Sequence, residues 1–146
     1  MKRAVIFFWL TVACGAAIPA VVAIWTASAK GAPLQTAIQE WTDNLFAPGA
    51  NELVLTLISA APFLLLAVLS LFHMSGGNSG PRTAGVSGAL MAGVALAVQV
   101  HSSIRMSHHS TAAIGFFFLP FEELIVMPIG YGFGRLVSSL LRRLKP

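Results

Sequence analysis

Two adjacent glutamates are the residues of this chain best suited to chemistry, because the stretch around them has no other charge. Glu122 and Glu123 lie near the middle of the apolar run from Ala112 to Gly134. A carboxylate at the centre of a membrane costs about 2.5–3.5 kcal/mol on insertion scales, and such groups are usually paired, protonated or in use. We therefore take this pair as the candidate ion- or proton-binding site.

Proline and glycine around the glutamates predict a break in the helix that carries them. Pro120 cannot donate a backbone hydrogen bond and clashes with the preceding turn. It also favours the first turn of a helix, where carboxylates are stabilised. Pro128 and the glycines of residues 130–134 weaken the helix further. We predict a broken fourth span in which the glutamates begin a half-helix, as in the discontinuous helices of transporters.

The two glutamates should face different surroundings. Neighbouring residues on a helix point about 100° apart, so one carboxyl should face the bundle interior and the other a neighbour, a cavity or a second subunit. Two interpretations remain open, a proton or cation site and a structural hydrogen-bonding pair. The candidate contacts within the chain are Thr56, Ser59, Gln99 and Arg105.

Histidines form a second candidate group. His101, His108 and His109 lie around the link between the third and fourth spans. Imidazoles at one depth could bind zinc or copper, or ligate haem. No cysteine or carboxylate at ligand spacing accompanies them, and the neighbouring serines are typical of a polar loop. A metal or haem site is thus the weakest hypothesis, and we expect no cofactor.

The sequence lacks the residue patterns of an enzyme or a nucleic-acid-binding protein. No nucleophile elbow accompanies the serines and histidines of the link, and adjacent carboxylates on one helix do not flank a substrate as a glycosidase pair does. The net charge of +4 comes from scattered basic residues and not from a basic patch. The single cysteine, Cys14, excludes an intrachain disulfide.

Composition indicates which elements must position these residues. The chain is 56% hydrophobic and 10% charged, whereas soluble domains carry about 25% charged residues. Too little polar surface remains for a soluble domain, so the lipid bilayer is an expected partner. We predict one all-α, polytopic membrane domain over residues 1–146, with an uncleaved first helix. The predicted transmembrane helices cover about residues 4–28, 52–74, 83–101 and 112–137.

A short amphipathic helix is predicted at residues 33–47, between the first two spans. Its apolar residues recur at helical spacing: Leu34, Ile38, Trp41 and Leu45. The helix either lies in the external membrane interface, with Trp41 at headgroup level, or caps the bundle. The sequence alone does not decide between these two positions of the helix.

Small residues at four-residue spacing predict close helix packing. Rows of this kind allow the backbones of membrane helices to approach closely. They place the third span at the centre of the bundle or at an oligomer interface. The candidate packing residues are Gly88, Ala92 and Gly93 in the third span, and Gly130 and Gly134 in the fourth.

The distribution of basic residues predicts the orientation. Of the nine lysines and arginines, only Lys30 and Arg105 fall on the side away from the termini. Cytoplasmic segments carry the excess of such residues, so we expect both termini in the cytoplasm and the protein in the cell (inner) membrane.

Three functional hypotheses follow. The first is a small four-helix protein without enzymatic activity that acts as a subunit or partner of a membrane complex, or as a homo-oligomer. The alternative is a proton- or cation-coupled transporter or channel that uses Glu122 or Glu123 in the broken fourth helix. The third is metal or haem binding by the external histidines.

Overall fold

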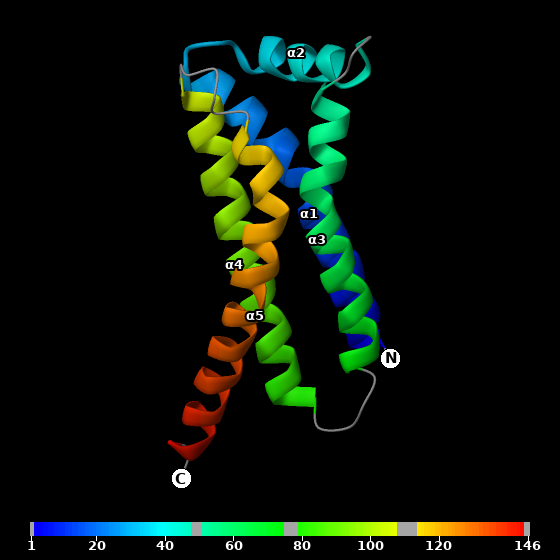
Figure 1. The fold of residues 1–146 in the computed structure, drawn as a ribbon, viewed down its shortest axis with the longest axis vertical. Coiled ribbons are helices and arrows are strands. Elements are labelled where there is room, and N and C mark those ends of the chain that lie inside the picture. The colour runs from blue at the N-terminus through cyan, green and yellow to red at the C-terminus, as the bar shows by residue number, and fades with distance from the viewer. Residues whose placement is uncertain (1, 48–50, 75–78, 108–113, 145–146) are drawn as a thin grey trace.

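The protein is built entirely from helices in the computed structural model, which describes residues 2–47, 51–74, 79–107 and 114–144 (Figure 1). Four of its helices are long and apolar enough to cross a membrane. These findings confirm the predicted all-α class with four apolar helices, and they indicate a small multi-pass membrane protein. The helices are α1 (Lys2–Ala29), α2 (Leu34–Phe46), α3 (Asn51–Met74), α4 (Ser79–Met106) and α5 (Ile114–Arg143).

The four long helices form two antiparallel pairs, α1 with α3 and α4 with α5 (Figure 1). The contact between α4 and α5 is the most extensive, and α1 joins the two pairs by packing against α4. Both ends of the chain lie at one end of the bundle, and α2 lies across the opposite end (Figure 1). We call these the terminal end and the α2 end.

Small residues bring α4 and α5 into direct backbone contact. Gly88 and Gly130 each lie against the other's carbonyl oxygen, and Gly134 lies against the carbonyl oxygen of Ala84. The Ala92 side chain also faces Gly130. A side chain at any of these glycines would overlap the facing helix. These small residues therefore hold together two helices of the same chain.

The prediction of a broken fourth span is wrong, because α5 is one continuous helix from Ile114 to Arg143. It includes both Pro120 and Pro128. Each proline removes one backbone donor, but neighbouring helices and local adjustments can satisfy the freed carbonyl in a membrane helix. Here α4 packs extensively against α5 and supports the helical backbone. The glutamates thus lie within an unbroken helix.

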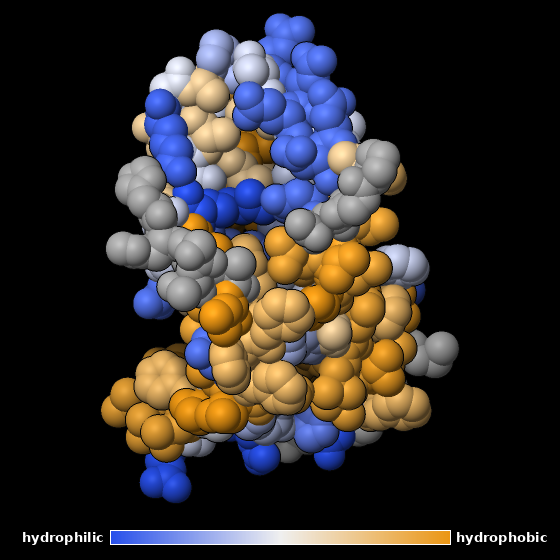
Figure 2. Space-filling view, turned by 45° about the horizontal axis from the view of Figure 1, so that its top comes forward, coloured by the Kyte–Doolittle hydropathy of each residue, from blue (hydrophilic) through white to orange (hydrophobic). Residues whose placement is uncertain are grey.

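The larger of two groups of buried apolar side chains in the described part of the bundle interior is drawn from all four long helices. We call it the apolar cluster, and its members are Ile18, Val22, Phe63, Ala89, Leu90, Ala97 and Met127. Gly93 lies against Phe63 and Met127 within it. On the face shown in Figure 2, hydrophobic residues form a band across the bundle, with hydrophilic residues gathered beyond it at both ends. Such a band is the surface expected to face lipid.

The amphipathic helix predicted at residues 33–47 is present as α2. It contacts α1 and α3, yet only Ala37 is fully buried. The exposed fractions of Leu34, Ile38 and Phe46 are 62%, 45% and 75%. Much of the apolar face of α2 therefore remains uncovered by the bundle.

Candidate functional site

Glu123 is completely buried inside the bundle. It belongs to the stripe of α5 that faces inward, together with Phe116, Leu119 and Met127. These residues are three or four positions apart, which places them on one helix face. The exposed fraction of Glu123 is 0%, and neither carboxylate oxygen has a hydrogen-bond partner among the described residues. A carboxyl group in this position is costly unless it is neutral or solvated by water or an ion.

Glu122 faces outward, away from the bundle interior. Its side chain is exposed, and so are its neighbours Phe121 (65% exposed) and Ile125 (64% exposed). The outer surface of α5 therefore carries a carboxyl group within an apolar face. The structure thus distinguishes the two glutamates, with Glu123 inside and Glu122 outside.

The depth of Glu123 follows from the contacts between α4 and α5. Toward the terminal end, Gly93 faces Met127. Toward the α2 end, the rings of His101 and Phe116 lie 4.7 Å apart. Glu123 comes four residues before Met127 and seven after Phe116. It therefore lies between these two contacts, about one turn from the first and two turns from the second.

His101 is a second buried polar side chain in the same interior. Its exposed fraction is 0%. Its Nε2 lies 3.1 Å from the Oγ of Ser59, which belongs to α3 and is also buried. The other ring nitrogen, Nδ1, has no partner in the part of the chain that the structure describes. An imidazole can donate from one nitrogen while it accepts at the other, so Nδ1 of His101 can hydrogen-bond to a water molecule while Nε2 contacts Ser59.

Charged residues gather at the α2 end of this interior. Nη2 of Arg105 lies 2.6 Å from Oε2 of Glu52, and Nζ of Lys30 donates to the carbonyl oxygen of Arg105 at 2.6 Å. Glu52 lies at the start of α3 and Arg105 at the end of α4. About one fifth of each side chain of this ion pair is exposed. The pair therefore borders both the surface and the interior.

Polar groups lie between the α2 end and the middle of the bundle, and two contacts join them, Arg105 with Glu52 and His101 with Ser59. Glu123 lies further in, about two turns of α5 from the contact of Phe116 with His101. We call these groups the polar column, which consists of Glu52, Thr56 and Ser59 on α3, His101 and Arg105 on α4, and Glu123 on α5. Their spacings of three or four residues place the α3 members on one face and the α4 members on another. Beyond Glu123 the interior continues as the apolar cluster, with Met127 one turn further along α5.

The polar column contains several buried atoms that lack partners. Besides both oxygens of Glu123, these are Oγ1 of Thr56, Nδ1 of His101 and Nε of Arg105, as counted over residues 2–47, 51–74, 79–107 and 114–144. Buried polar atoms in proteins are nearly always satisfied by protein groups, ordered water or ions. Bound water or a cation can satisfy unpartnered atoms of this kind.

The structure gives the histidine hypothesis a different geometry from the predicted one. His101 lies inside the bundle and contacts Ser59 and Phe116, so it does not belong to an external loop. His108 and His109 lie outside the described residues. Within those residues, no group of three or more histidine, cysteine, aspartate or glutamate side chains is arranged to hold a metal ion.

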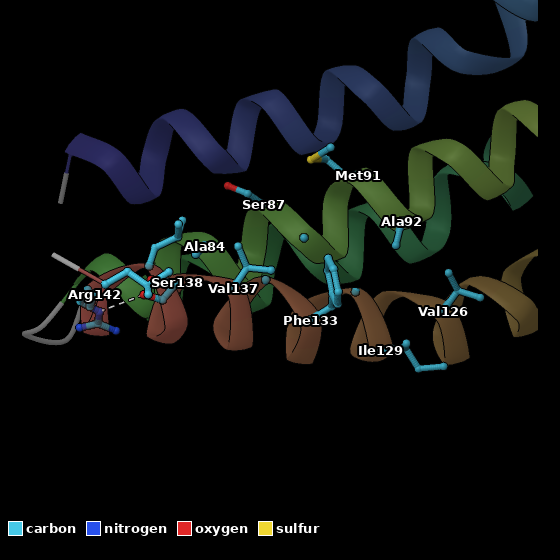
Figure 3. A pocket seen from close by; sticks show the side chains of 15 residues that line it. Ala84, Ser87, Met91, Ala92, Val126, Ile129, Phe133, Val137, Ser138 and Arg142 are labelled. Atoms are coloured by element: carbon cyan, nitrogen blue, oxygen red, sulfur yellow. Dashed lines mark hydrogen bonds between the residues drawn. The ribbon is translucent and has the colours of Figure 1, made fainter.

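The structure has two hollows that are lined by no residue of the polar column. A cavity of about 640 Å³ lies between α3, α4 and α5 near the terminal end. A groove of about 970 Å³ follows the α4–α5 contact, and Figure 3 shows its side chains, with Arg142 near the C-terminal end. Neither hollow is lined by Glu122 or Glu123.

Sequence reasoning identified Glu123 but not its surroundings. It named Thr56, Ser59, Gln99 and Arg105 as possible contacts of the glutamates, but neither oxygen of Glu123 has a hydrogen-bond partner among the described residues. It also placed His101 at the external end of the third span. The three-to-four-residue spacing of Glu52, Thr56 and Ser59 was the available signal. The chain matches no protein-family model, no curated protein and no solved structure.

Proposed function

We propose that the chain is a small multi-pass membrane protein in which Glu123 binds and releases a proton, or a small cation, during transport. The observation that carries this proposal is the fully buried carboxyl group of Glu123, whose two oxygens lack partners among the described residues, at the inner end of the polar column. A structural carboxyl would be expected to have a hydrogen-bond partner in the protein.

The chemistry of the column supports exchange with the α2 end. A protonated Glu123 is neutral and therefore compatible with a buried position, whereas the ionised form needs water or a cation beside it. Water bound along the column would be held by the hydroxyls of Thr56 and Ser59 and the ring of His101. Figure 2 shows that the α2 end is hollowed and rimmed by hydrophilic residues, which favours access for water from that side.

The orientation of the protein decides the direction of this access. Basic residues are concentrated at the terminal end, so we place both termini in the cytoplasm and the protein in the cell (inner) membrane. The α2 end and the opening of the polar column then face outward. Glu123 is accordingly loaded from outside, and the apolar cluster separates it from the cytoplasmic side.

The test is proton flux in liposomes that contain a pH-sensitive dye and the purified protein. We expect a flux that Glu123→Gln reduces to the level of protein-free liposomes, because the amide cannot carry a proton or an exchangeable charge. The matched control is Glu122→Gln, which changes the neighbouring carboxyl and should keep the flux. Equal behaviour of the two variants, or no flux from the wild-type protein under an imposed gradient, would contradict the proposal.

A second function is favoured by Glu122. Its exposed carboxyl lies on an otherwise apolar face of α5, where contact with lipid alone is unfavourable. A hydrogen-bond donor or basic group of another membrane protein, or of a second copy of this chain, would relieve that cost. We therefore also propose that α5 is the face through which the protein joins an oligomer or a membrane complex.

Assembly can be tested separately from transport. We expect Glu122→Leu to shift the protein to a smaller species in light scattering after mild solubilisation, because leucine cannot make the polar contact. Ile125→Leu is the control on the same face. The proposal fails if the wild-type protein is monomeric in membranes by cross-linking, or if both variants assemble as the wild type does.

A further inference from the structure

The cavity near the terminal end has a mostly apolar wall. Side chains from α3, α4 and α5 line its roughly 640 Å³, and they include Leu66, Leu69, Ala89, Leu124 and Met127. This volume lies within the range of small-molecule sites, about 300–1,000 Å³. Leu69 and Leu124 are 53% and 47% exposed, so the cavity is open at the side of the bundle. In a membrane this opening would face the acyl chains of lipids.

The end of the cavity nearest the terminal end is polar and basic. The Tyr131 hydroxyl and Nε2 of His73 form a hydrogen bond that joins α5 to α3. The guanidinium of Arg135 lies 5.9 Å from the centre of the Tyr131 ring. Arg82 of α4 donates to the backbone carbonyl of His73 at 3.3 Å. Two arginines from different helices thus lie close to the His73–Tyr131 pair.

The charges of the cavity determine what can bind there. Arg135 is among the lining residues, and no described aspartate or glutamate lines the cavity. A ligand that complements the charge of Arg135 is an anion, and a hydrocarbon chain on this anion would complement the apolar wall. Basic pockets between transmembrane helices on the cytoplasmic side bind anionic lipid headgroups, and the terminal end is the basic end of this protein.

We propose that this cavity binds an anionic phospholipid from the surrounding membrane. One acyl chain lies along Leu66, Leu69 and Leu124, and the phosphate contacts Arg135 and the hydroxyl of Tyr131. Glu123 is not among the residues that line the cavity, so lipid binding there does not require proton exchange at Glu123. The cavity would remain a lipid site even if the protein transported nothing.

The first experiment measures lipid preference. Purified full-length protein is equilibrated with mixed micelles that contain equal amounts of phosphatidylglycerol and phosphatidylcholine of the same chain length, and the retained lipid is measured by native mass spectrometry. We expect the wild type to retain phosphatidylglycerol preferentially, and Arg135→Gln to lower that preference about fivefold, the effect of one basic residue near an anionic lipid. Arg143→Gln removes a charge from the same helix outside the cavity and should retain the preference.

A second pair of variants tests the apolar part. Leu69→Trp fills the cavity and should abolish retention of phosphatidylglycerol, whereas Leu64→Trp adds the same ring on the outer face of α3 and should not. A monodisperse elution profile is the folding control. If Leu69→Trp does not fold, Arg135→Gln still decides the question.

Three results would overturn the proposal. An equal loss of the preference for phosphatidylglycerol in Arg135→Gln and Arg143→Gln would show that the preference depends on the overall surface charge and not on the cavity. Equal retention of the two lipids by the wild type would show that the site does not select an anion. Displacement of phosphatidylglycerol by excess inorganic phosphate would show that the site binds a free anion and needs no acyl chain.

Discussion

Glu122 and Glu123 carry the same side chain one position apart, and the packing of α5 against α4 gives them opposite surroundings. The 100° step between neighbours on a helix predicts this difference from sequence. It does not predict which glutamate lies inside, because that depends on how α5 is rotated about its own axis. The rotation follows from the contacts of Phe116 and Met127 with α4, and those contacts require the three-dimensional structure.

The substitution Glu123→Leu distinguishes a functional role of the Glu123 carboxyl group from a structural role. Glu123→Leu removes a buried group that has no protein partner among the described residues. It should therefore raise the free energy of unfolding by about 1–3 kcal/mol, the cost of an unsatisfied buried polar group, while it abolishes proton flux. Thermal unfolding in detergent, followed by circular dichroism, measures the first effect. A loss of stability of similar size would indicate a structural hydrogen bond.

The contact between Glu52 and Arg105 should be modest in strength and sensitive to salt. Both side chains are about one fifth exposed, so we expect a coupling energy of about 1 kcal/mol, at the upper end for ion pairs near a surface. A double-mutant cycle of Glu52→Gln and Arg105→Gln at low and high ionic strength measures it. Coupling that is absent at low salt would contradict the ion pair.

The helices were largely predictable, and their differences from prediction have physical causes. Hydropathy placed the end of the third span near His101, but α4 continues to Met106. Arg105 in this added stretch pairs with Glu52 of α3, and this contact holds the polar end of the helix against the bundle. For α5, rules for proline in isolated helices predicted a break, whereas support from α4 keeps the helix continuous.

Glycines of α4 and α5 allow a matched test of helix packing. Gly88→Ala places a methyl group against the carbonyl oxygen of Gly130 and should destabilise the protein by about 1–3 kcal/mol, the usual effect of overpacking. Gly132→Ala meets no atom within 4 Å and should be neutral or stabilising, because alanine is the better helix former by about 1 kcal/mol. Thermal unfolding of both variants measures the two effects. An equal loss of stability in Gly88→Ala and Gly132→Ala would contradict the close approach of α4 and α5 at Gly88.

The whole molecule has two distinct ends. The α2 end carries the ion pair of Glu52 and Arg105, and the terminal end carries most of the basic residues. Sequence predicted this polarity, since it depends only on chain order and charge. The polar column was not predictable in the same way, because its members come from three helices whose relative rotation the sequence does not specify.

Cysteine labelling in intact cells tests the orientation. In a Cys14→Ala background, Glu40→Cys on α2 should react with a membrane-impermeant maleimide added outside, whereas Arg143→Cys should react only after the membrane is permeabilised. Both positions are exposed in the structure, so accessibility depends on the side of the membrane. The reverse pattern would place the opening of the polar column in the cytoplasm.

The polar contacts between helices have a mechanical consequence. At the α2 end, Arg105 of α4 is tied to Glu52 of α3; at the terminal end, Tyr131 of α5 is tied to His73 of α3. The α4–α5 pair is thus joined to α3 by one polar contact toward each end of the bundle, while glycine contacts pack α4 and α5 closely against each other. Rotation of the α4–α5 pair relative to α3 would have to break either the Arg105–Glu52 ion pair or the Tyr131–His73 hydrogen bond. The contact that stays intact would then be the pivot of the motion, and the two possible pivots lie on either side of Glu123 along the bundle.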